Sequence, residues 1–480
     1  MAGIRLQLLP SSELDAIRGA SLRILSRVGV KVHHEEIIEL LGEAGADVDR
    51  SRSIARLPER LVLTCAERAQ KSYILYGRDG SRSARFGHGD RTYLSSPGQY
   101  GWIDLATGVR RPPTLEDARA AIRLGDALEG IHVVGPMAQP AEIPEAYRDV
   151  ALTAELVRGT AKPTRSWVRS GASARYVLEI YAAAAGGWEA LRRRPMTEAF
   201  LEPVSPLQLP RDGLDVLREF VRAGQPVSIG PMAMAAGTAP ATLAGTLAQE
   251  NAEVLAGVVV AQVLAPGTPV TYGGIPHVLD PRTSICSFGS PEQGLMAVAM
   301  VEIARSYGFP VYVNVGLTDA KVLDAQAGAE KAASLLLGAL AGADTFGHCG
   351  ICGTDHAGSL AWLVADEEIA RYVERILRGF EVGAESLGEG AIEAVGPGGD
   401  FLSEPHTVRW FRREIWIPGA VWTREGYEAW RAAGATSFGD RAAARARELL
   451  AEHAPAPIAP ELAREIEGIV ERARRELRTW

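Results

Sequence analysis

The chain has 480 residues, of which 47% are hydrophobic and 23% are charged, and its formal net charge at pH 7 is -8. Because nucleic acids and anionic membranes attract basic surfaces, this acidic balance argues against both as partners. The first residues lack a long apolar core followed by a cleavage site, so we do not expect a signal peptide. With only four cysteines in the chain, we expect a reduced protein in the cytoplasm.

Residues 1–90 are predicted to form an α+β accessory segment. Apolar residues recur with helical spacing over residues 14–28, and a short strand is predicted at 30–33. A second helix is predicted over residues 35–44, where Gly45 ends it.

Residues 91–400 repeat one pattern and are predicted to form a catalytic (β/α)8 TIM barrel. Short apolar runs end in glycine, proline or a polar residue, and Ala- and Leu-rich stretches of helical length separate them. Such runs are typical of parallel strands that helices cover on both faces. Eight runs are expected, at residues 93–96, 131–137, 164–170, 199–206, 226–232, 269–275, 310–316 and 343–349. In this α/β fold, functional residues lie at the C-terminal ends of the strands.

Residues 401–480 are predicted to form a C-terminal helical extension. The segment begins with an aromatic-rich stretch that contains Trp410, Trp416 and Trp422. Two charged helices follow, over residues 440–453 and 460–480, and a proline-rich joint separates them.

Two long stretches of the chain resemble signatures of the trimethylamine methyltransferase family. They are Gly-Thr-Ala-Pro-Ala-Thr-Leu-Ala-Gly-Thr-Leu-Ala-Gln-Glu-Asn-Ala-Glu-Val-Leu-Ala-Gly at 237–257 and Thr-Asp-Ala-Lys-Val-Leu-Asp-Ala-Gln-Ala-Gly-Ala-Glu-Lys at 318–331. Shorter matches occur at residues 75–79, 104–112, 205–207, 396–399 and 406–409. The resemblance therefore covers nearly the whole chain.

The resemblance implies a TIM barrel that transfers a methyl group from a methylated amine to the Co(I) of a corrinoid (cobalamin). The corrinoid is usually held on a separate carrier protein, so it is a methyl acceptor and not a resident group. Archaeal trimethylamine enzymes of the family contain pyrrolysine, whereas this chain contains only the twenty standard residues. It therefore resembles the branch whose members demethylate quaternary amines such as glycine betaine, which makes trimethylamine a less expected substrate. A homo-oligomer is also expected.

Aromatic residues near the predicted strand ends are candidates for holding the cation. A quaternary ammonium over an aromatic face is stabilised by roughly 0.5–2 kcal/mol. The same residues could instead be ordinary core packing. The substrate-binding candidates are Trp167, Tyr272, Tyr312 and Phe346, with Tyr100 on a rim loop.

Four polar residues are the other candidates. Asp319 follows a predicted strand by two residues, so it is either catalytic or the cap of the next helix. Glu202 lies within a predicted strand and is either catalytic or ion-paired. His348, at a strand end, is a catalytic candidate, and His277 is either a substrate ligand or bonded to backbone. We expect Asp319, His348, Tyr272 and Tyr312 to line one cavity.

Cys349 and Cys352, with His348 and His356 nearby, could bind zinc, as in corrinoid methyltransferases that activate thiols and alcohols. Since this spacing occurs only once, we expect no tightly bound metal and interpret both cysteines as buried apolar groups. Two alternatives to the corrinoid-dependent reaction remain open. One is a zinc-assisted methyltransferase, and the other is a barrel that binds quaternary amines without catalysis.

Overall fold

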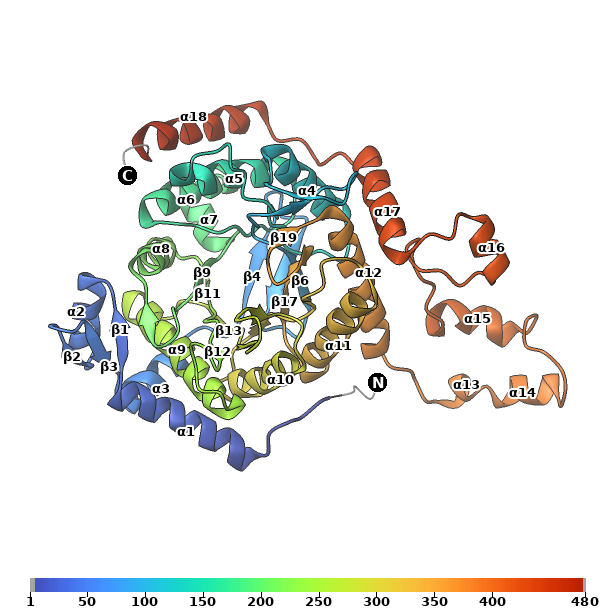
Figure 1. Cartoon of the computed structure of the whole chain (residues 1–480), viewed down its shortest axis with the longest axis horizontal. Helices are drawn as coiled ribbons and strands as arrows, with labels where there is room; N and C mark the ends of the chain where they lie inside the picture. Colours follow the sequence, from blue (N-terminus) through green and yellow to red (C-terminus); the bar gives the residue numbers. More distant parts are fainter. Residues whose placement is uncertain (1–4, 478–480) are drawn as a thin grey trace.

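The computed structural model describes residues 5–477 and has a parallel sheet at the centre of a ring of helices (Figure 1). The sheet has six strands in the order β6-β17-β16-β13-β11-β9, and every neighbouring pair is parallel. Their bounds are β6 Thr92–Ser95, β9 Ala199–Leu201, β11 Val227–Ile229, β13 Val270–Gly274, β16 Val311–Val313 and β17 Thr345–Cys349. The structure thus confirms a mixed α/β fold and six of the eight predicted strands.

The other two predicted strands, at residues 131–137 and 164–170, do not form regular ladders. Isolated parallel bridges join Leu94 to Val133 and Val134 to Thr164. Proline has no backbone N–H to donate, and Pro136 and Pro163 lie in or beside these segments. The regular sheet is therefore an open set of six strands and not the closed eight-stranded sheet that the sequence predicts.

Helices follow the strands and cover the outside of the sheet. Side-chain caps fix where several begin: Thr114 and Asp117 form a capping box at α4, and Asp324 caps α11. The longest, α9, is apolar enough by composition to span a membrane, but most of it is buried inside the protein. The bounds are α4 Leu115–Ala127, α5 Glu145–Gly159, α6 Gly171–Ala185, α7 Trp188–Arg193, α8 Arg211–Arg222, α9 Leu243–Leu264, α10 Pro291–Ser306, α11 Ala325–Ala341 and α12 Leu360–Leu377.

The N-terminal segment packs beside the sheet and closes its N-terminal end. The predicted helices and the short strand are confirmed as α1, α2 and β1, and β1 pairs in parallel with β10, Gln208–Leu209. Tyr73 of β4 reaches the strands, where its hydroxyl donates to Glu198 Oε2 at 2.5 Å. The bounds are α1 Ser11–Arg27, β1 Val30–Val32, α2 Glu35–Glu43, β2 Asp47–Asp49, β3 Ile54–Arg56, α3 Glu59–Arg68, β4 Tyr73–Tyr76 and β5 Ser83–Phe86.

Short strands in the loops after the strands of the central sheet form two small sheets. One contains β12 Met234–Ala235, β14 His277–Leu279 and β15 Cys286–Ser287. The other contains β7 Trp102–Ile103, β8 Arg110–Arg111, β18 Ile351–Cys352 and β19 Ala357–Gly358. Because they follow the strand ends, these sheets build the rim of the functional face.

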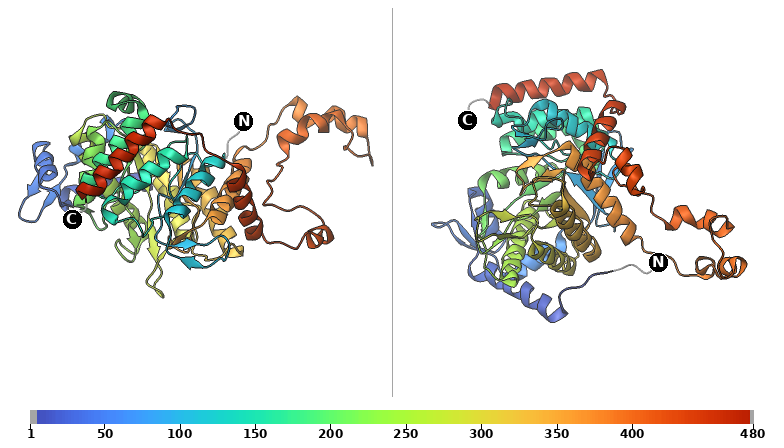
Figure 2. Two further views of the ribbon diagram at one scale, coloured as in Figure 1. Left: turned by 90° about the horizontal axis from the view of Figure 1, so that it is seen from above. Right: turned by 45° about the vertical axis from the view of Figure 1, so that its right-hand side comes forward.

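The C-terminal part leaves the body after α12 and returns to it. Helices α13 Ala384–Leu387, α14 Glu389–Val395, α15 Pro405–Glu414 and α16 Tyr427–Ala432 project from the body, as both views show (Figure 2). Then α17, Phe438–Glu452, packs on α12, and α18, Pro460–Glu476, packs on α5 and α6.

Candidate active site

Two neighbouring segments, residues 164–170 and β9 with its flanks, point alternate side chains to the inner face of the sheet. On and around β9, the inward residues are Glu198, Phe200 and Glu202, because successive side chains of a strand point to opposite faces. In the 164–170 segment, Arg165 and Trp167 point inward. The Arg165 guanidinium carbon lies 4.6 Å from the centre of the Phe200 ring, and the rings of Trp167 and Phe200 are 5.5 Å apart.

Four aromatic side chains meet at the C-terminal end of the sheet. Phe200 lies between Trp167 and Tyr312, with the Phe200–Tyr312 ring centres 6.0 Å apart in an edge-to-face arrangement. His348 completes the group: its ring is 6.1 Å from Trp167, and its Nε2 is 3.1 Å from the Tyr312 hydroxyl. This cluster offers both ring faces and ring edges to a bound cation.

A buried ion pair forms the floor under these rings. Arg165 Nη1 lies 3.2 Å from Glu198 Oε1, and both side chains are almost fully buried. Burial raises the pKa of Glu198, although Arg165 and the Tyr73 hydroxyl pull it down. Among the residues that the structure describes, the two terminal Arg165 nitrogens have no hydrogen-bond partner. The guanidinium instead lies against the Phe200 and Tyr312 rings, so it fixes where they sit.

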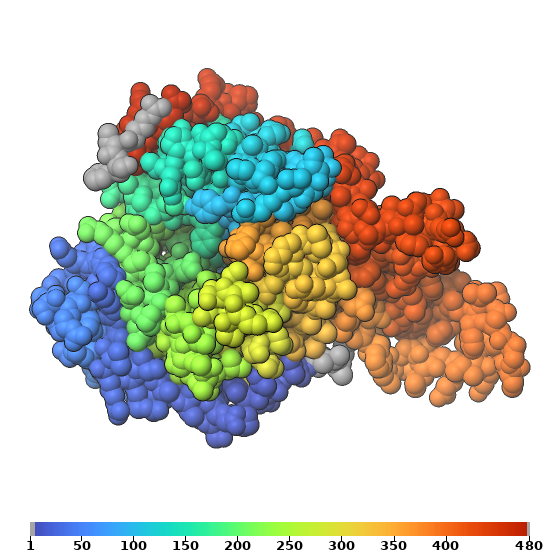
Figure 3. Space-filling model, viewed as in Figure 1, coloured from blue at the N-terminus to red at the C-terminus, as the bar shows by residue number. Residues whose placement is uncertain are grey.

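Two carboxyl groups face the space above the rings. Glu202 and Asp355 are both exposed to solvent although protein surrounds them, as expected for side chains that line a recess. We call this recess, between the aromatic rings and the two carboxyl groups, the hollow. Burial, and then the charge of Asp355, raise the pKa of Glu202 to about 7. Burial also raises the pKa of Asp355 to about 6, against a hydrogen bond from Gln99. The space-filling view shows this face hollowed near its centre, beside the green part of the chain (Figure 3).

Within residues 5–477, Glu202 has no ion-pair partner, because Arg165 pairs with Glu198 instead. Of the two readings that the sequence left for Glu202, the ion pair is therefore wrong. An acidic pair without a cation is costly in a recessed space, and a cationic ligand would lower that cost.

The two histidines of the site are neutral at physiological pH. Burial, and then the charge of Arg165, lower the pKa of His348 to about 3. Burial lowers the pKa of His277 to about 4. His277 Nδ1 is 2.6 Å from the carbonyl oxygen of Ile275, so the backbone contact that the sequence left open is present. His277 also packs on Phe288, with ring centres 4.5 Å apart.

Asp319 connects two rim loops. Its carboxylate accepts hydrogen bonds from Ser287 Oγ at 2.5 Å, the backbone N–H of Phe288 at 2.7 Å and Thr354 Oγ1 at 2.8 Å. Burial pushes its pKa up, but these hydrogen bonds outweigh burial and the pKa lies below its usual value. It is not the cap of α11, which is Asp324. Through these hydrogen bonds, Asp319 ties together the loops around the hollow.

Two of the aromatic candidates point away from the hollow. Tyr272 is fully buried on the helix side of β13, where its hydroxyl donates to Asn251 Oδ1 of α9 at 2.8 Å. Phe346 is buried on the helix side of β17 and stacks on Tyr93 at 5.1 Å. Their places contradict the expectation that they contact the substrate. Tyr100 lies on the rim, where its hydroxyl accepts from Arg169 Nη1 at 2.5 Å.

Several residues of the hollow were not among the sequence-based candidates: Gln99, Glu198, Phe200 and Asp355. The spacing of Glu198, Phe200 and Glu202 at every second residue could have found two of them, since all three share one face of a strand. Asp355 gave no such signal, because its loop returns to the hollow only through the tertiary fold.

The cysteines do not gather around a common point with other ligands. Cys352 Sγ donates to the Ala357 carbonyl oxygen at 3.6 Å, and burial raises its pKa to about 11. Burial also raises the pKa of Cys349. In residues 5–477, no three side chains of the His, Cys, Asp and Glu types are grouped to hold a metal ion.

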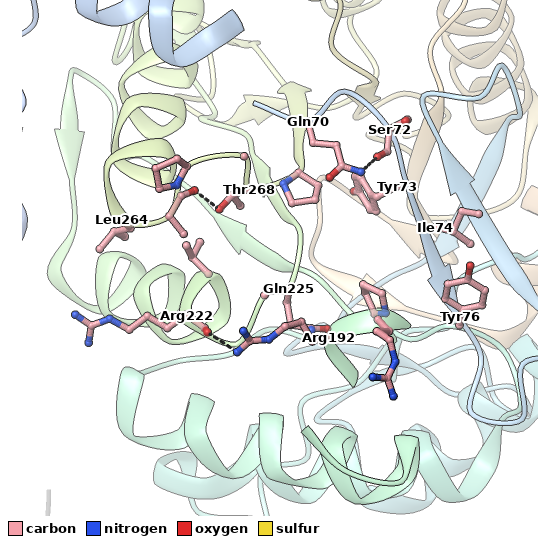
Figure 4. Close-up of a pocket in the computed structure, with 18 of the residues that line it drawn as sticks. Gln70, Ser72, Tyr73, Ile74, Tyr76, Arg192, Arg222, Gln225, Leu264 and Thr268 are labelled. Carbon is pink, nitrogen blue, oxygen red and sulfur yellow. Dashed lines mark hydrogen bonds between the residues drawn. The ribbon is translucent and has the colours of Figure 1, made fainter. Parts of the chain in front are cut away.

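A cavity of about 690 Å³ lies at the opposite end of the sheet (Figure 4). Its lining comes from the loops before β9, β11 and β13 and includes Arg192, Gln225 and Thr268. Functional residues of barrel enzymes lie at the C-terminal strand ends, so the candidate active site is the hollow and not this cavity.

The fold is similar to that of a known methylamine methyltransferase. The superposition on monomethylamine methyltransferase (MtmB) of Methanosarcina barkeri has a TM-score of 0.51 and 12% identity, and it covers 97% of this chain and 93% of that one. At this identity, the likeness defines the fold class alone.

Sequence comparison defines the family. The model of the trimethylamine methyltransferase (MTTB) family matches residues 3–478. The chain is 32% identical to trimethylamine methyltransferase MttB of Desulfitobacterium hafniense, over 96% of this chain and 92% of the relative. It is 31% identical to a glycine betaine methyltransferase of the same species, over 98% of both. The chain belongs to the trimethylamine methyltransferase family.

Proposed function

We propose that this protein transfers a methyl group from a quaternary amine such as glycine betaine to the Co(I) of a corrinoid protein. The observation that supports it best is the hollow itself, where Trp167, Phe200 and Tyr312 lie beside Glu202 and Asp355. Aromatic faces and unpaired carboxylates together suit a cation that cannot donate a hydrogen bond.

The charge of the substrate decides which groups the reaction needs. Co(I) attacks a methyl carbon in line, and a quaternary nitrogen then leaves as a neutral amine. No side chain has to protonate the leaving group. A tertiary amine such as trimethylamine needs activation first, so we expect it to be a poorer substrate. The work of this chain is positioning and electrostatics, which hold the methyl carbon toward the open mouth.

Each residue of the hollow has a part in this proposal. Trp167 and Phe200 contact the methyl groups that stay on the nitrogen. Tyr312 is held by His348 and by the Arg165 guanidinium, so its ring keeps one orientation. Glu202 and Asp355 neutralise the substrate charge while it is bound, and they cease to do so as the neutral amine forms.

The assembly around the site follows the family resemblance. We propose that the six-stranded sheet and the bridged segments near 134 and 164 act together as a (β/α)8 barrel. A corrinoid carrier protein presents the cobalt at the mouth, which must admit a corrinoid face. The proposal also includes a cytoplasmic location, a homo-oligomer and no tightly bound metal.

A substrate panel tests this function. Glycine betaine, other betaines and trimethylamine would be compared at equal concentration, with cob(I)alamin as the acceptor and the absorbance of methylcobalamin as the readout. We expect turnover with one or more quaternary amines. Turnover with trimethylamine alone would show that the quaternary assignment is wrong, and binding without turnover would favour a non-catalytic role. Metal analysis of the same protein would detect zinc, and one zinc per chain bound by Cys349 and Cys352 would favour the zinc-assisted reaction.

A further inference from the structure

Residues 380–417, which we name the arm, expose an unusual amount of apolar surface. The arm contains α13, α14 and α15, and no residue of these three helices is buried, all of them lying within the described chain. Ten large apolar side chains of the arm are exposed: Phe380, Val382, Leu387, Ile392, Phe401, Leu402, Val408, Phe411, Ile415 and Ile417. Leu402, the most open of them, is 87% exposed.

The base of the arm is fixed to the body. Arg375 of α12 donates to the Glu414 carbonyl oxygen at 2.5 Å and to the Gly379 carbonyl oxygen at 3.0 Å, so it holds both ends of the arm. Trp416, at the end of the arm, and Trp422, just beyond it, pack on Tyr372, each with ring centres 5.5 Å away. The arm therefore has a defined root, and both ribbon views show it projecting away from the barrel (Figure 2).

The size of this surface matches a permanent interface. Ten side chains of this kind expose on the order of 1,000 Å² of apolar area, against about 800 Å² that one partner contributes to a standard stable interface. Monomeric proteins rarely expose contiguous apolar patches of more than a few hundred Å². A partner that docks and leaves at every turnover would uncover the arm between visits. A second copy of the same chain is always present in equal amount and can cover it permanently.

The body carries an apolar groove that could receive such an arm. It has a volume of about 420 Å³ and lies between α1, α9 and α10. Leu9, Ile17, Leu247 and Met296 form its walls, and Leu295, which is 43% exposed, stands at its edge. On α15, Val408 and Phe411 are three residues apart and so lie on one helix face, which is the shape an apolar groove between helices accepts.

We propose that the arm packs into the α1–α9–α10 groove of a second copy of this chain. The interaction then buries the apolar face of α15 in one subunit and Leu295 in the other. It explains why α13, α14 and α15 are regular helices although their own chain leaves them without a core.

Mass in solution tests this interface directly, because one chain has a mass of 51.3 kDa. The variants would be Val408→Glu in the arm and Leu295→Glu in the groove, and both residues are exposed, so neither change disturbs the core. Val109→Glu is the matched control, since Val109 is 62% exposed and lies outside the arm and the groove. Light scattering would give the mass, and circular dichroism would confirm that each variant is folded.

We expect the unaltered protein and the control to have a multiple of 51.3 kDa, and both test variants to shift toward 51.3 kDa. A monomeric unaltered protein would overturn the proposal, and so would an oligomer that Val408→Glu leaves intact. Dissociation by Val408→Glu but not by Leu295→Glu would overturn the groove as the binding surface. These results do not depend on activity, so they stand apart from the test of the proposed function.

Discussion

Two tyrosines on neighbouring strands show how the fold separates the candidate active site from the packing of the helices. Gly273 is paired with Tyr312, so Tyr272, one residue earlier on β13, points to the other face of the sheet. Tyr312 faces the hollow and contacts His348, whereas Tyr272 faces α9 and donates to Asn251. Both are buried, both are hydrogen-bonded and both have raised pKa values because of burial. Only the face of the sheet on which each lies distinguishes them.

Charged residues follow the same division. Glu202 faces the hollow with no partner cation among residues 5–477, and Asp366 lies behind β17, where it pairs with Lys331 at 2.9 Å. A group that faces the hollow is available to a ligand, while a group behind the sheet stabilises the packing of the helices. The comparison therefore predicts that substitutions facing the hollow lower activity more than stability, and that substitutions behind the sheet lower stability more than activity.

The largest difference in activity and stability is expected between variants of Glu202 and Asp366. Glu202→Gln should lower kcat/KM by about 100-fold, because a charge that faces the cation is lost, without lowering stability. Asp366→Asn should leave kcat near its original value but lower the free energy of unfolding by about 3 kcal/mol, because Lys331 stays buried without its partner. Steady-state kinetics and urea unfolding measure the two effects. Equal activity losses in both variants would contradict the division.

The tyrosine pair should show a smaller contrast. Tyr312→Phe removes the contact with His348 and should lower turnover by about tenfold, with little loss of stability. Tyr272→Phe leaves Asn251 without its donor and should lower the free energy of unfolding by about 1–3 kcal/mol at unchanged turnover. Each variant is the control of the other. A turnover defect in Tyr272→Phe would show that the helix side of β13 takes part in the reaction.

The pH dependence of KM should report the carboxyl pair. As pH falls from 8 toward 5, Glu202 and Asp355 take up protons near their pKa values of about 7 and about 6, so attraction for the cation weakens and KM rises. A quaternary amine does not titrate, and both histidines stay neutral in this range. In Glu202→Gln, only the change in KM near pH 6, which comes from Asp355, should remain. A KM that is flat in the unaltered protein would rule out the pair as the cation site.

The raised pKa values of Glu202 and Asp355 also make the stability of the folded protein depend on pH. The folded protein holds these protons more tightly than the unfolded chain, so the free energy of unfolding should fall as pH rises from about 4.5 to about 7. Denaturant midpoints at several pH values, compared with those of Glu202→Gln, would separate this contribution from the rest of the protein.

A small effect on turnover is expected at Asp319, which lies at the rim and belongs to neither face. Asp319→Ala removes the acceptor for three donors and should lower the free energy of unfolding by about 1–3 kcal/mol. Turnover should fall only a few-fold, because the loops around the hollow loosen. A loss of turnover as large as that of Glu202→Gln, at full stability, would assign Asp319 a direct role in the reaction. Thermal melts and kinetics decide between the two.

Part of the site could be predicted from the sequence, and the reason for the failures is physical. The sequence predicts Tyr312 and His348 in one cavity because both lie at strand ends, and in the structure the Tyr312 hydroxyl is 3.1 Å from His348 Nε2. Tyr272 and Phe346 lie in strands that are buried on both sides. Such strands are apolar throughout and carry no alternation, so the sequence does not show which face a given residue occupies.

The sequence by itself determined the parallel α/β architecture, the accessory helices and the family, because these follow from the order of apolar runs and from long stretches that resemble the family's signatures. Only the tertiary structure decided that Asp355 returns to face Glu202, that Arg165 pairs with Glu198, and that the arm has no core of its own. Each depends on contacts between residues far apart in the chain. The free energy of such contacts comes from burial and charge in three dimensions, and no local pattern of residues encodes it.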